Sequence, residues 1–407
     1  MKEDIKEAPD RGESTGLMEP LLISEDSRHR GPLTDLAVEL SGKASGFRAS
    51  LTPSVRAALA ELVRSMNCYY SNLIEGHDTH PIDIERALKD DYSQDKKKRD
   101  LQLEAKAHIA VQCWIDDGNL KGRTVSATGL CEIHRRFCDL LPEEMLWVED
   151  PESHERLRVV PGELRKRDVK VARHVAISPG AIPRFLEQFE RVYSRVGKTD
   201  AILAAAAAHH RLLWIHPFLD GNGRVTRLMS HAMLLDALDT GGVWSVARGL
   251  ARNVEKYKAH LAEADLPRRN DLDGRGSLSE EALASFTRFF LETALDQVKF
   301  MEELVQPDRL RTRIQLWAEE EIRLNKLPPK AGNVLEAVLY RGELPRADVA
   351  SLLGSTPRHA RRIVSALLDR GVLASKGIRE PLALACPVAL ASRWMPGLFP
   401  DKVGGDG

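Results

Sequence analysis

The sequence predicts a mainly α-helical protein, and three observations carry this prediction. Apolar residues recur at intervals of three and four in several long stretches, which is the period of a helix with one buried face. Thr52 and Pro53 begin the first of these stretches as helices commonly begin, and Gly76 ends it. One stretch, residues 159–177, alternates basic and apolar residues with period two and is typical of a short β-hairpin.

The first part of the chain is expected to contain a tail followed by helices. Residues 1–50, above all those up to Gly31, interleave glycine, proline, serine and charge, which predicts a flexible segment that adds little to the core. Helices are predicted over residues 51–76, from Pro81, over residues 101–116 and over residues 126–141. The lysine run at residues 96–98 is interpreted as a solvated link.

The middle of the chain is expected to pack around one buried helix. After Thr199 and Asp200, an alanine-rich stretch runs to Ile215; alanine favours a helix and lets neighbouring helices approach closely. Pro217 ends this helix. Other helices are predicted over residues 182–196, from the loop at 221–223 to Gly241, and over residues 244–264 and 279–305.

The C-terminal part has the pattern of a winged helix-turn-helix over residues 331–400, joined by a charged helical linker at 307–330. Helices are predicted at 333–341 and 345–353, and a tight turn leads to a third helix that carries Arg358, Arg361 and Arg362. Residues 372–384 would form the wing. Such a module binds DNA, docks a protein or dimerises, and the sequence leaves all three open.

Composition excludes some classes of protein and favours a cytoplasmic location. The 407 residues include 59 basic and 60 acidic ones, so the near-zero net charge gives no general affinity for nucleic acid or anionic membrane. Five scattered cysteines without metal-type spacing are interpreted as reduced thiols. Neither an N-terminal apolar run nor a membrane-spanning stretch is present in the sequence.

The loop at residues 216–227, HPFLDGNGRVTR, has the composition of a phosphate-handling site. Gly221 and Gly223 around Asn222 allow a tight turn that points backbone N–H groups at one anion. Arg224 and Arg227, three residues apart on the following helix, can grip successive phosphates. Taken singly, such residues are more often a plain turn or a solvated arginine pair, but their combination within twelve residues favours a phosphate site.

Two further side chains in this loop supply chemistry. Asp220 is a hard oxygen ligand placed beside the phosphates, which suits Mg²⁺. An imidazole ordinarily titrates near neutral pH, so His216 is expected to take a proton from an attacking hydroxyl. Taken alone, a histidine that follows Trp214 and Ile215 is more often a packed core residue.

At every constrained position the loop resembles the signature of Fic enzymes, His-x-Phe-x-Asp/Glu-Gly-Asn-Gly-Arg-x-x-Arg. The resemblance implies a helical Fic-type core that transfers AMP from ATP to a hydroxyl side chain (Ser, Thr or Tyr) of a protein, with Mg²⁺. It further implies that His216 is the base and that Arg227 reaches the γ-phosphate. The remaining roles implied are a metal ligand at Asp220, phosphate binding by Gly221, Asn222, Gly223 and Arg224, and a core anchor at Phe218.

Residues 71–76, SNLIEG, resemble the inhibitory motif of the same family, Ser/Thr-x-x-x-Glu-Gly/Asn. Ser71 and Glu75 are one helical turn apart on one face. The resemblance implies that Glu75 pairs with Arg227 and so occupies the arginine that the γ-phosphate of ATP needs. The alternative is an ordinary surface glutamate that precedes a helix-ending glycine.

The hairpin at 159–177 corresponds in Fic enzymes to the flap, which aligns a target peptide by strand addition. This role falls on Val169, Lys170, Val171 and Ala172; the alternative is a hairpin without function. The basic flap side chains, Arg165, Lys166, Arg167, Lys170 and Arg173, would favour acidic targets or are simply solvated. The resemblance also implies that Asn253 and Tyr257 line the adenine and ribose pocket, against the alternative of surface polar residues.

These interpretations divide the chain into a flexible segment (1–50), a Fic-type core (51–306) with an inhibitory helix (52–76) and a flap (159–177), the helical linker and the winged helix-turn-helix. The predicted function is that of an autoinhibited protein adenylyltransferase with ATP and Mg²⁺. The alternatives are a Fic enzyme that uses another nucleotide donor or removes AMP, and a nucleotide-sensing DNA-binding regulator. DNA, another protein or a second copy of this chain stays open as the partner of the winged helix.

Overall fold

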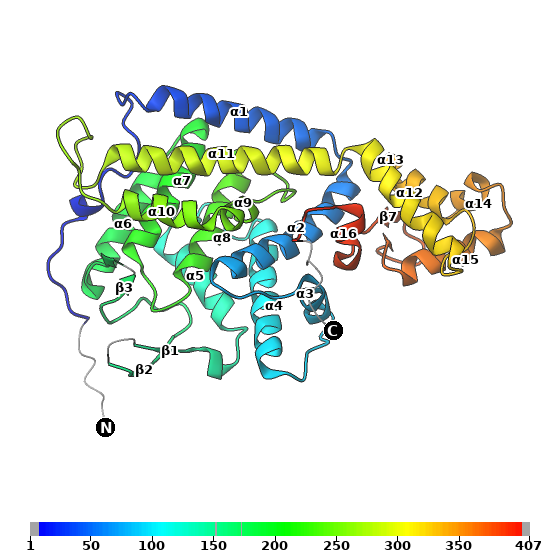
Figure 1. Cartoon of the computed structure of the whole chain (residues 1–407), viewed down its shortest axis with the longest axis horizontal. Helices are drawn as coiled ribbons and strands as arrows, with labels where there is room; N and C mark the ends of the chain where they lie inside the picture. Colours follow the sequence, from blue (N-terminus) through cyan, green and yellow to red (C-terminus); the bar gives the residue numbers. More distant parts are fainter. Residues whose placement is uncertain (1–7, 151–152, 172, 401–407) are drawn as a thin grey trace.

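The computed structural model describes residues 8–150, 153–171 and 173–400, and it confirms the prediction of a mainly α-helical fold (Figure 1). The α-helices are α1 (Arg30–Ala49), α2 (Pro53–Ile74), α3 (Pro81–Leu88), α4 (Lys96–Asp116), α5 (Ala127–Cys138), α6 (Ile182–Tyr193), α7 (Lys198–Ile215), α8 (Asn222–Leu238), α9 (Ala247–Arg252), α10 (Val254–Ala264), α11 (Glu280–Leu304), α12 (Pro307–Arg323), α13 (Ala331–Arg341), α14 (Asp348–Leu352), α15 (Pro357–Asp369) and α16 (Ala391–Trp394). The strands are β1 (Trp147–Glu149), β2 (Arg156–Arg158), β3 (Lys170–Val171), β4 (His174–Val175), β5 (Glu343–Leu344), β6 (Leu373–Ala374) and β7 (Leu382–Leu384).

Helix α7 is the centre of the core. It packs against α8, α11, α1 and α6, and its alanines at residues 204–208 are all buried. Because alanine has only a methyl side chain, the backbones of the surrounding helices can come close to that of α7. The packing of α7 against α8 fixes the loop between them, where the predicted phosphate-handling residues lie.

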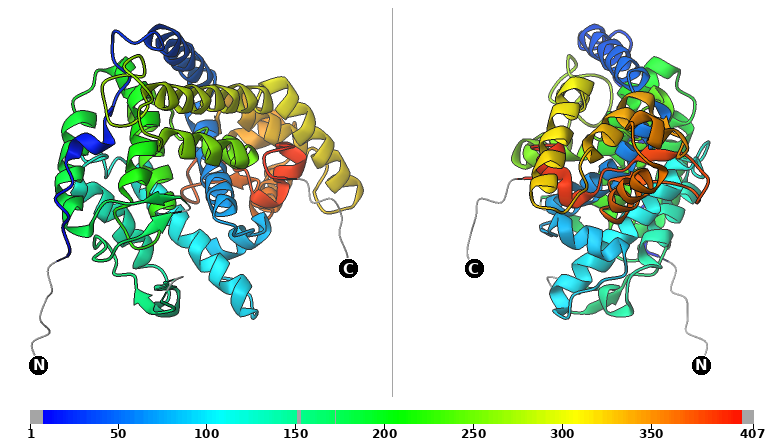
Figure 2. Two further views of the ribbon diagram at one scale, coloured as in Figure 1. Left: turned by 60° about the vertical axis from the view of Figure 1, so that its left-hand side comes forward. Right: turned by 90° about the vertical axis from the view of Figure 1, so that its right-hand side faces the viewer.

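The N-terminal segment differs from the expected flexible tail. Residues 30–49 form α1, which lies along α11 in all views (Figures 1 and 2). Leu33, Leu40 and Phe47 are buried along this contact, and Met18 is buried ahead of the helix. The glycines and serines of α1 lie on its outer face, and apolar residues at helical spacing form its buried face. The expectation of a flexible segment, which came from composition, was therefore wrong for this helix.

Three other local expectations need correction. The lysine run at 96–98 is the first turn of α4, since the Asp95 side chain accepts a hydrogen bond from the Lys98 N–H and caps the helix. The helix expected over residues 244–264 is broken into α9 and α10 at Asn253, whose backbone is not helical. Strands β1 and β2 form a hairpin that was not predicted.

The predicted flap hairpin is present but short. Strand β3 pairs with β4 in antiparallel register, with Lys170 opposite Val175 and Val171 opposite His174. Val169 precedes β3, and Ala172 lies outside the described residues. Most of residues 159–177 is therefore irregular backbone that leads into and out of a two-residue ladder.

The C-terminal lobe contains α13, α14 and α15 and a three-stranded sheet in the order β5-β7-β6. The chain then turns back, and α16 packs against α12, while β7 contacts α2. Tyr70 of α2 donates its hydroxyl hydrogen bond to the Leu398 carbonyl at 3.0 Å, and Tyr69 packs edge-on against Phe399. The two lobes are thus joined by direct contacts as well as by α12.

In the part of the chain that the structure describes, each helix is too short or too polar to cross a bilayer.

Candidate active site

The loop between α7 and α8 is bounded by two residues in the left-handed backbone region. His216 ends α7 with φ 51° and ψ 63°, and Gly221 precedes α8 with φ 79°. Glycine adopts this conformation without a steric penalty, whereas a residue with a Cβ atom does so only when its surroundings hold it. His216 is thus the strained position of the loop and Gly221 the relaxed one.

The middle of the loop is held by Asn222 and Phe218. The Asn222 side chain accepts a hydrogen bond from the Phe218 N–H at 2.9 Å and donates one to the Phe218 carbonyl at 2.8 Å. The Phe218 ring is fully buried and stacks on His134 of α5, with ring centroids 4.2 Å apart and nearly parallel planes. The Asn222 side chain therefore holds the loop in shape, and only the backbone N–H of Asn222 is available to an anion. The Phe218 ring lies in the core, where the sequence predicts an anchor.

The N-terminus of α8 has no side-chain cap. Gly221 has no side chain to accept from the first N–H groups of the helix, which are left to an external acceptor. A carboxylate oxygen of Glu75 already lies against Gly223, so close that a Cβ atom added to Gly223 would overlap it. The absence of a side chain at Gly223 is what lets an anionic group approach the backbone here.

Glu75 and Ser71 both contact Arg227. Arg227 is buried; its Nε donates to the Ser71 hydroxyl at 2.9 Å, and its Nη2 donates to the Ser71 carbonyl and pairs with the Glu75 carboxylate. Burial raises the pKa of Glu75, but the charges of Arg227 and Arg224 lower it further, so the net pKa lies below the ordinary value. Glu75 is thus ionised at neutral pH and paired with the second arginine of the loop.

Arg224 pairs with a carboxylate of another helix. It is buried and pairs with Glu104 of α4, while His77 Nδ1 lies 2.8 Å from the other Glu104 oxygen. The hydrogen bond to Glu104 raises the pKa of His77. Each arginine of the loop is therefore matched with its own carboxylate, and the two do not present a free cationic pair.

Glu104 and His77 were missed from the sequence, although α4 carried a signal. Glu104, His108 and Gln112 recur at every fourth position and are all buried, so a polar row runs along a helix face that would otherwise be apolar. A charged residue is seldom fully buried unless it has a partner, and such a row predicts polar partners on the facing helix.

His216, the predicted base, is largely neutral at physiological pH. Burial, with a smaller contribution from the Arg165 guanidinium, lowers its pKa to about 4. A neutral imidazole has a free ring nitrogen that can accept a proton. Arg165 itself is buried and donates from Nε to the His216 carbonyl, so the expectation that its side chain faces a target or solvent was wrong.

Asp220 is exposed just before the uncapped start of α8 and makes no ion pair with any residue that the structure describes. A cavity of about 100 Å³ beside it is lined by Gly221, Arg224, His77 and Glu104, among others. Within the described ranges, no group of three or more His, Cys, Asp or Glu residues could hold a metal ion by itself. One free carboxylate at this position fits a Mg²⁺ ion whose other ligands would be phosphate oxygens and water.

Asn253 and Tyr257 do not share one surface. Asn253 is exposed and donates from its side chain to the Gly249 carbonyl at 3.0 Å, whereas Tyr257 is buried. The Tyr257 hydroxyl lies 2.7 Å from His209 Nε2, and the other ring nitrogen of His209 lies 2.8 Å from the Ser230 hydroxyl. The predicted nucleoside pair is thus separated in this conformation, and Tyr257 belongs to a hydrogen-bonded network behind the loop.

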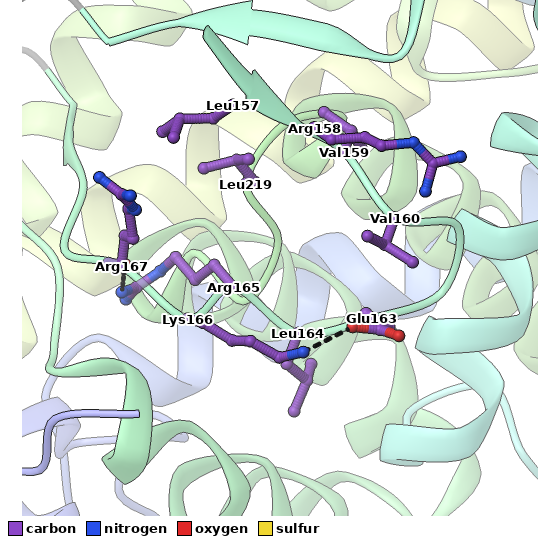
Figure 3. A pocket seen from close by; sticks show the side chains of 10 residues that line it. All are labelled: Leu157, Arg158, Val159, Val160, Glu163, Leu164, Arg165, Lys166, Arg167 and Leu219. Atoms are coloured by element: carbon purple, nitrogen blue, oxygen red, sulfur yellow. Dashed lines mark hydrogen bonds and ion pairs between the residues drawn. The ribbon is translucent and has the colours of Figure 1, made fainter. Parts of the chain in front are cut away.

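The flap lies beside the loop and exposes apolar side chains. Val171 and Val175 are 42% and 62% exposed, on the two strands of the hairpin. The segment that enters the flap forms a pocket of about 150 Å³ against Leu219 of the loop (Figure 3). In Figure 3 the Lys166 ammonium pairs with Glu163 at the rim of this pocket.

Comparisons with known proteins agree with this geometry. Residues 124–234 match the model of the Fic/DOC family. The chain is 27% identical over 171 residues to a protein adenylyltransferase Fic from Drosophila erecta and 29% identical over 171 residues to that of Drosophila melanogaster. Each match covers 42% of this chain and 32% of the relative, so the chain spans about a third of the length of the relatives it matches.

Solved structures show the same fold. A Fic family protein from Desulfovibrio desulfuricans is similar over 89% of this chain and 98% of its own, with a TM-score of 0.52 and 15% identity. A Fic-1 fragment from C. elegans is similar over 67% of this chain and 72% of its own, with a TM-score of 0.50 and 18% identity. The loop from His216 to Arg227 lies inside the region, residues 124–234, that matches the Fic/DOC family model.

Proposed function

We propose that the protein is an adenylyltransferase that transfers AMP from ATP to a hydroxyl side chain of a protein and releases pyrophosphate. The observation that carries this proposal is the neutral His216 beside an uncapped helix N-terminus and a free carboxylate. His216 would take the proton from the attacking hydroxyl, and the N–H groups at the start of α8 would hold the phosphate under attack. The names of the relatives support the same reaction.

Asp220 would hold Mg²⁺ together with phosphate oxygens. The ion would neutralise the charge that develops on the departing pyrophosphate. Arg227 would reach the γ-phosphate once Glu75 has left it, because its guanidinium is the group that Glu75 now neutralises. Arg224 would contribute to the same phosphates only if its pairing with Glu104 loosens.

The contact between Glu75 and Arg227 supports a proposal of autoinhibition. The Glu75 carboxylate lies between Arg227 and the Gly223 backbone, which are the groups that a nucleotide phosphate would need. Two anions cannot occupy one site without strong repulsion, so ATP would bind out of line or not at all while Glu75 stays in place. The inhibitory helix would have to shift for turnover.

The target protein would dock on the flap by backbone pairing. β3 and β4 form a two-residue ladder, and a segment of a target could add to its free edge. Val169, Lys170 and Val171 would flank the docked segment, and exposed Val171 and Val175 would contact its side chains. Recognition through the backbone asks little of the target sequence.

The winged helix-turn-helix would bind an acidic macromolecule, DNA or protein. Arg358, Arg361 and Arg362 on α15 are exposed and form no ion pairs with the residues that the structure describes. A groove of about 500 Å³ between α14, α15 and the wing is lined by Arg346 and Arg361 and by apolar side chains that include Ile378. Binding of the intact protein to duplex DNA, measured against salt concentration, would separate these partners.

The test of the main proposal uses purified wild type, Glu75→Gly and Glu75→Gly/His216→Ala with α-labelled ATP and Mg²⁺. Label on the protein itself and in cell lysate is scored. Label with Glu75→Gly alone is the expected result. Absence of label in all three proteins despite ATP binding would contradict AMP transfer and direct the search to another nucleotide donor, to AMP removal or to nucleotide sensing.

A further inference from the structure

Arg165, in the segment that enters the flap, is a buried cation without an acidic partner. Arg165 is 3% exposed, and no carboxylate within residues 8–150, 153–171 and 173–400 lies at salt-bridge distance from its guanidinium. Burial lowers its pKa to about 10, so the guanidinium remains charged at neutral pH. Because a buried charge is costly without compensation, other groups must stabilise it.

The compensating groups are backbone carbonyls at the end of α7 and at the base of the flap. Arg165 Nε donates to the His216 carbonyl at 2.7 Å, Nη1 to the Arg167 carbonyl at 2.8 Å and Nη2 to the Ile177 carbonyl at 2.6 Å. The Arg165 backbone N–H donates to the Pro217 carbonyl at 2.9 Å. The last carbonyls of a helix lack partners within the helix and carry partial negative charge, so this guanidinium caps α7.

The bond to His216 acts on the strained residue of the loop. His216 has φ 51°, which costs a residue with a Cβ atom free energy and persists only when its surroundings fix it. Arg165 holds the carbonyl of that same residue, and a second flap residue, His174, donates from Nε2 to the Trp214 carbonyl at 2.7 Å. In Figure 3 a dashed line joins the Arg165 guanidinium to Arg167, whose carbonyl accepts from Nη1.

The neighbouring arginine of the flap is a matched control. Arg167 pairs with Glu155 through both nitrogens of its fork, and its side chain is 53% exposed. An exposed pair of this kind contributes little to stability. The two residues thus have the same type of side chain and lie in the same segment, but only Arg165 contacts the backbone of the predicted base.

We propose that Arg165 is the positioning residue for the base of the AMP transfer reaction: its guanidinium fixes the left-handed backbone of His216 and ties it to the flap. This inference rests on the proposed function. It assigns to the flap a second task besides docking, because the same segment that would receive the target sets the direction of the imidazole. Displacement of the base by about 1 Å can reduce a rate on the order of 10²-fold.

The test compares Arg165→Gln, Arg165→Lys and Arg167→Gln in the Glu75→Gly background. Lysine keeps the charge but cannot reach the three carbonyls at once, whereas glutamine loses the charge. We expect both Arg165 variants to reduce kcat on the order of 10²-fold, with the Kd of ATP within twofold of the parent. Arg167→Gln, whose side chain does not contact His216, should leave the Kd of ATP unchanged and should not reproduce the 10²-fold loss of kcat. Equal kcat in all four proteins, or a loss of ATP affinity in proportion to rate, would overturn the proposal.

The pH profile of kcat separates positioning from a merely structural role. The groups that face His216 are Arg165 and His174, which lower its pKa, and Asp220, which raises it. Loss of the Arg165 charge should therefore move the acidic limb of the profile to higher pH in Arg165→Gln but leave it in place in Arg165→Lys. Identical limbs in the two variants would contradict the assignment.

A readout without turnover distinguishes failure of this inference from failure of the proposed function. The imidazole signals of His216, assigned by their loss in His216→Ala, can be titrated by NMR in each protein. We expect a changed chemical shift of His216 in both Arg165 variants and none in Arg167→Gln, whether or not AMP is transferred. Unchanged His216 signals in folded Arg165→Lys and Arg165→Gln would refute the positioning role even if the parent is active.

Discussion

Replacement of Glu75 by glycine is the most informative perturbation of this protein. The change removes the carboxylate that contacts Arg227 and Gly223 and leaves Arg227 bound to Ser71 alone. Arg227 is then a buried cation with no carboxylate at its Nη2 atom, and a γ-phosphate can supply the missing charge. We therefore expect faster AMP transfer in the variant.

The size of the increase follows from the contact that is lost. A hydrogen bond to a charged group contributes about 1.5–3 kcal/mol. ATP must displace this contact in the wild type but not in the variant. A free-energy difference of about 1.4 kcal/mol corresponds to a factor of ten in an equilibrium constant. The expected gain in kcat/KM for ATP is therefore about 10- to 150-fold. Glu75→Gln, which keeps the shape of the side chain but loses its charge, should give a smaller gain.

The assay is the initial rate of label transfer from α-labelled ATP at several ATP concentrations, with Glu61→Gln as the control. Glu61 lies on the exposed part of α2, so its loss changes the charge of the same helix without touching the loop. An equal rate in wild type and Glu75→Gly would refute the reasoning, because the contact would then impose no barrier to ATP. An equal gain in Glu61→Gln would show that the charge of α2 matters and the contact does not.

Other consequences can be measured on the same protein. In the Glu75→Gly background, His216→Ala should reduce transfer by about 10²- to 10⁴-fold without changing ATP binding measured by calorimetry, since only the proton acceptor is lost. In the same background Arg227→Ala should raise the KM for ATP, and an unchanged response of rate to ATP would contradict a γ-phosphate role. Phe218→Ala should lower the free energy of unfolding by about 3–5 kcal/mol, measured with denaturant, because the ring is fully buried against His134. A shift from pH 7 to pH 5 should also destabilise the protein. Burial lowers the pKa values of His134 and His216 to about 4 in the folded state, whereas histidines of the unfolded chain titrate near 6.5. Between these pKa values the unfolded chain binds more protons than the folded protein, so falling pH favours unfolding. Each of the two should cost about 2 kcal/mol at pH 5, and equal denaturant midpoints at the two pH values would contradict this.

Much of the fold could be predicted because helices carry local signals. Apolar spacing and capping residues predicted α2 and α11 within a few residues, and the alanine run predicted a buried α7. The composition of α1 concealed its apolar stripe, because glycine and serine at its exposed positions are also typical of flexible segments. The local sequence pattern thus failed to predict α1, because the residues on its outer face have the composition of a loop.

The residues of the loop that could bind phosphate can be identified without a structure, since the chemistry of Gly221, Gly223 and Asp220 depends on residue type. The partners of the charged groups depend instead on how the helices pack. Arg224 pairs with Glu104 across 120 residues of sequence, and Arg165 reaches the His216 carbonyl across 51. The neighbouring sequence of an arginine does not reveal whether its guanidinium is solvated or buried. Burial, and the groups that stabilise the buried charge, depend on which distant segments the packing of α4, α7 and α8 brings together.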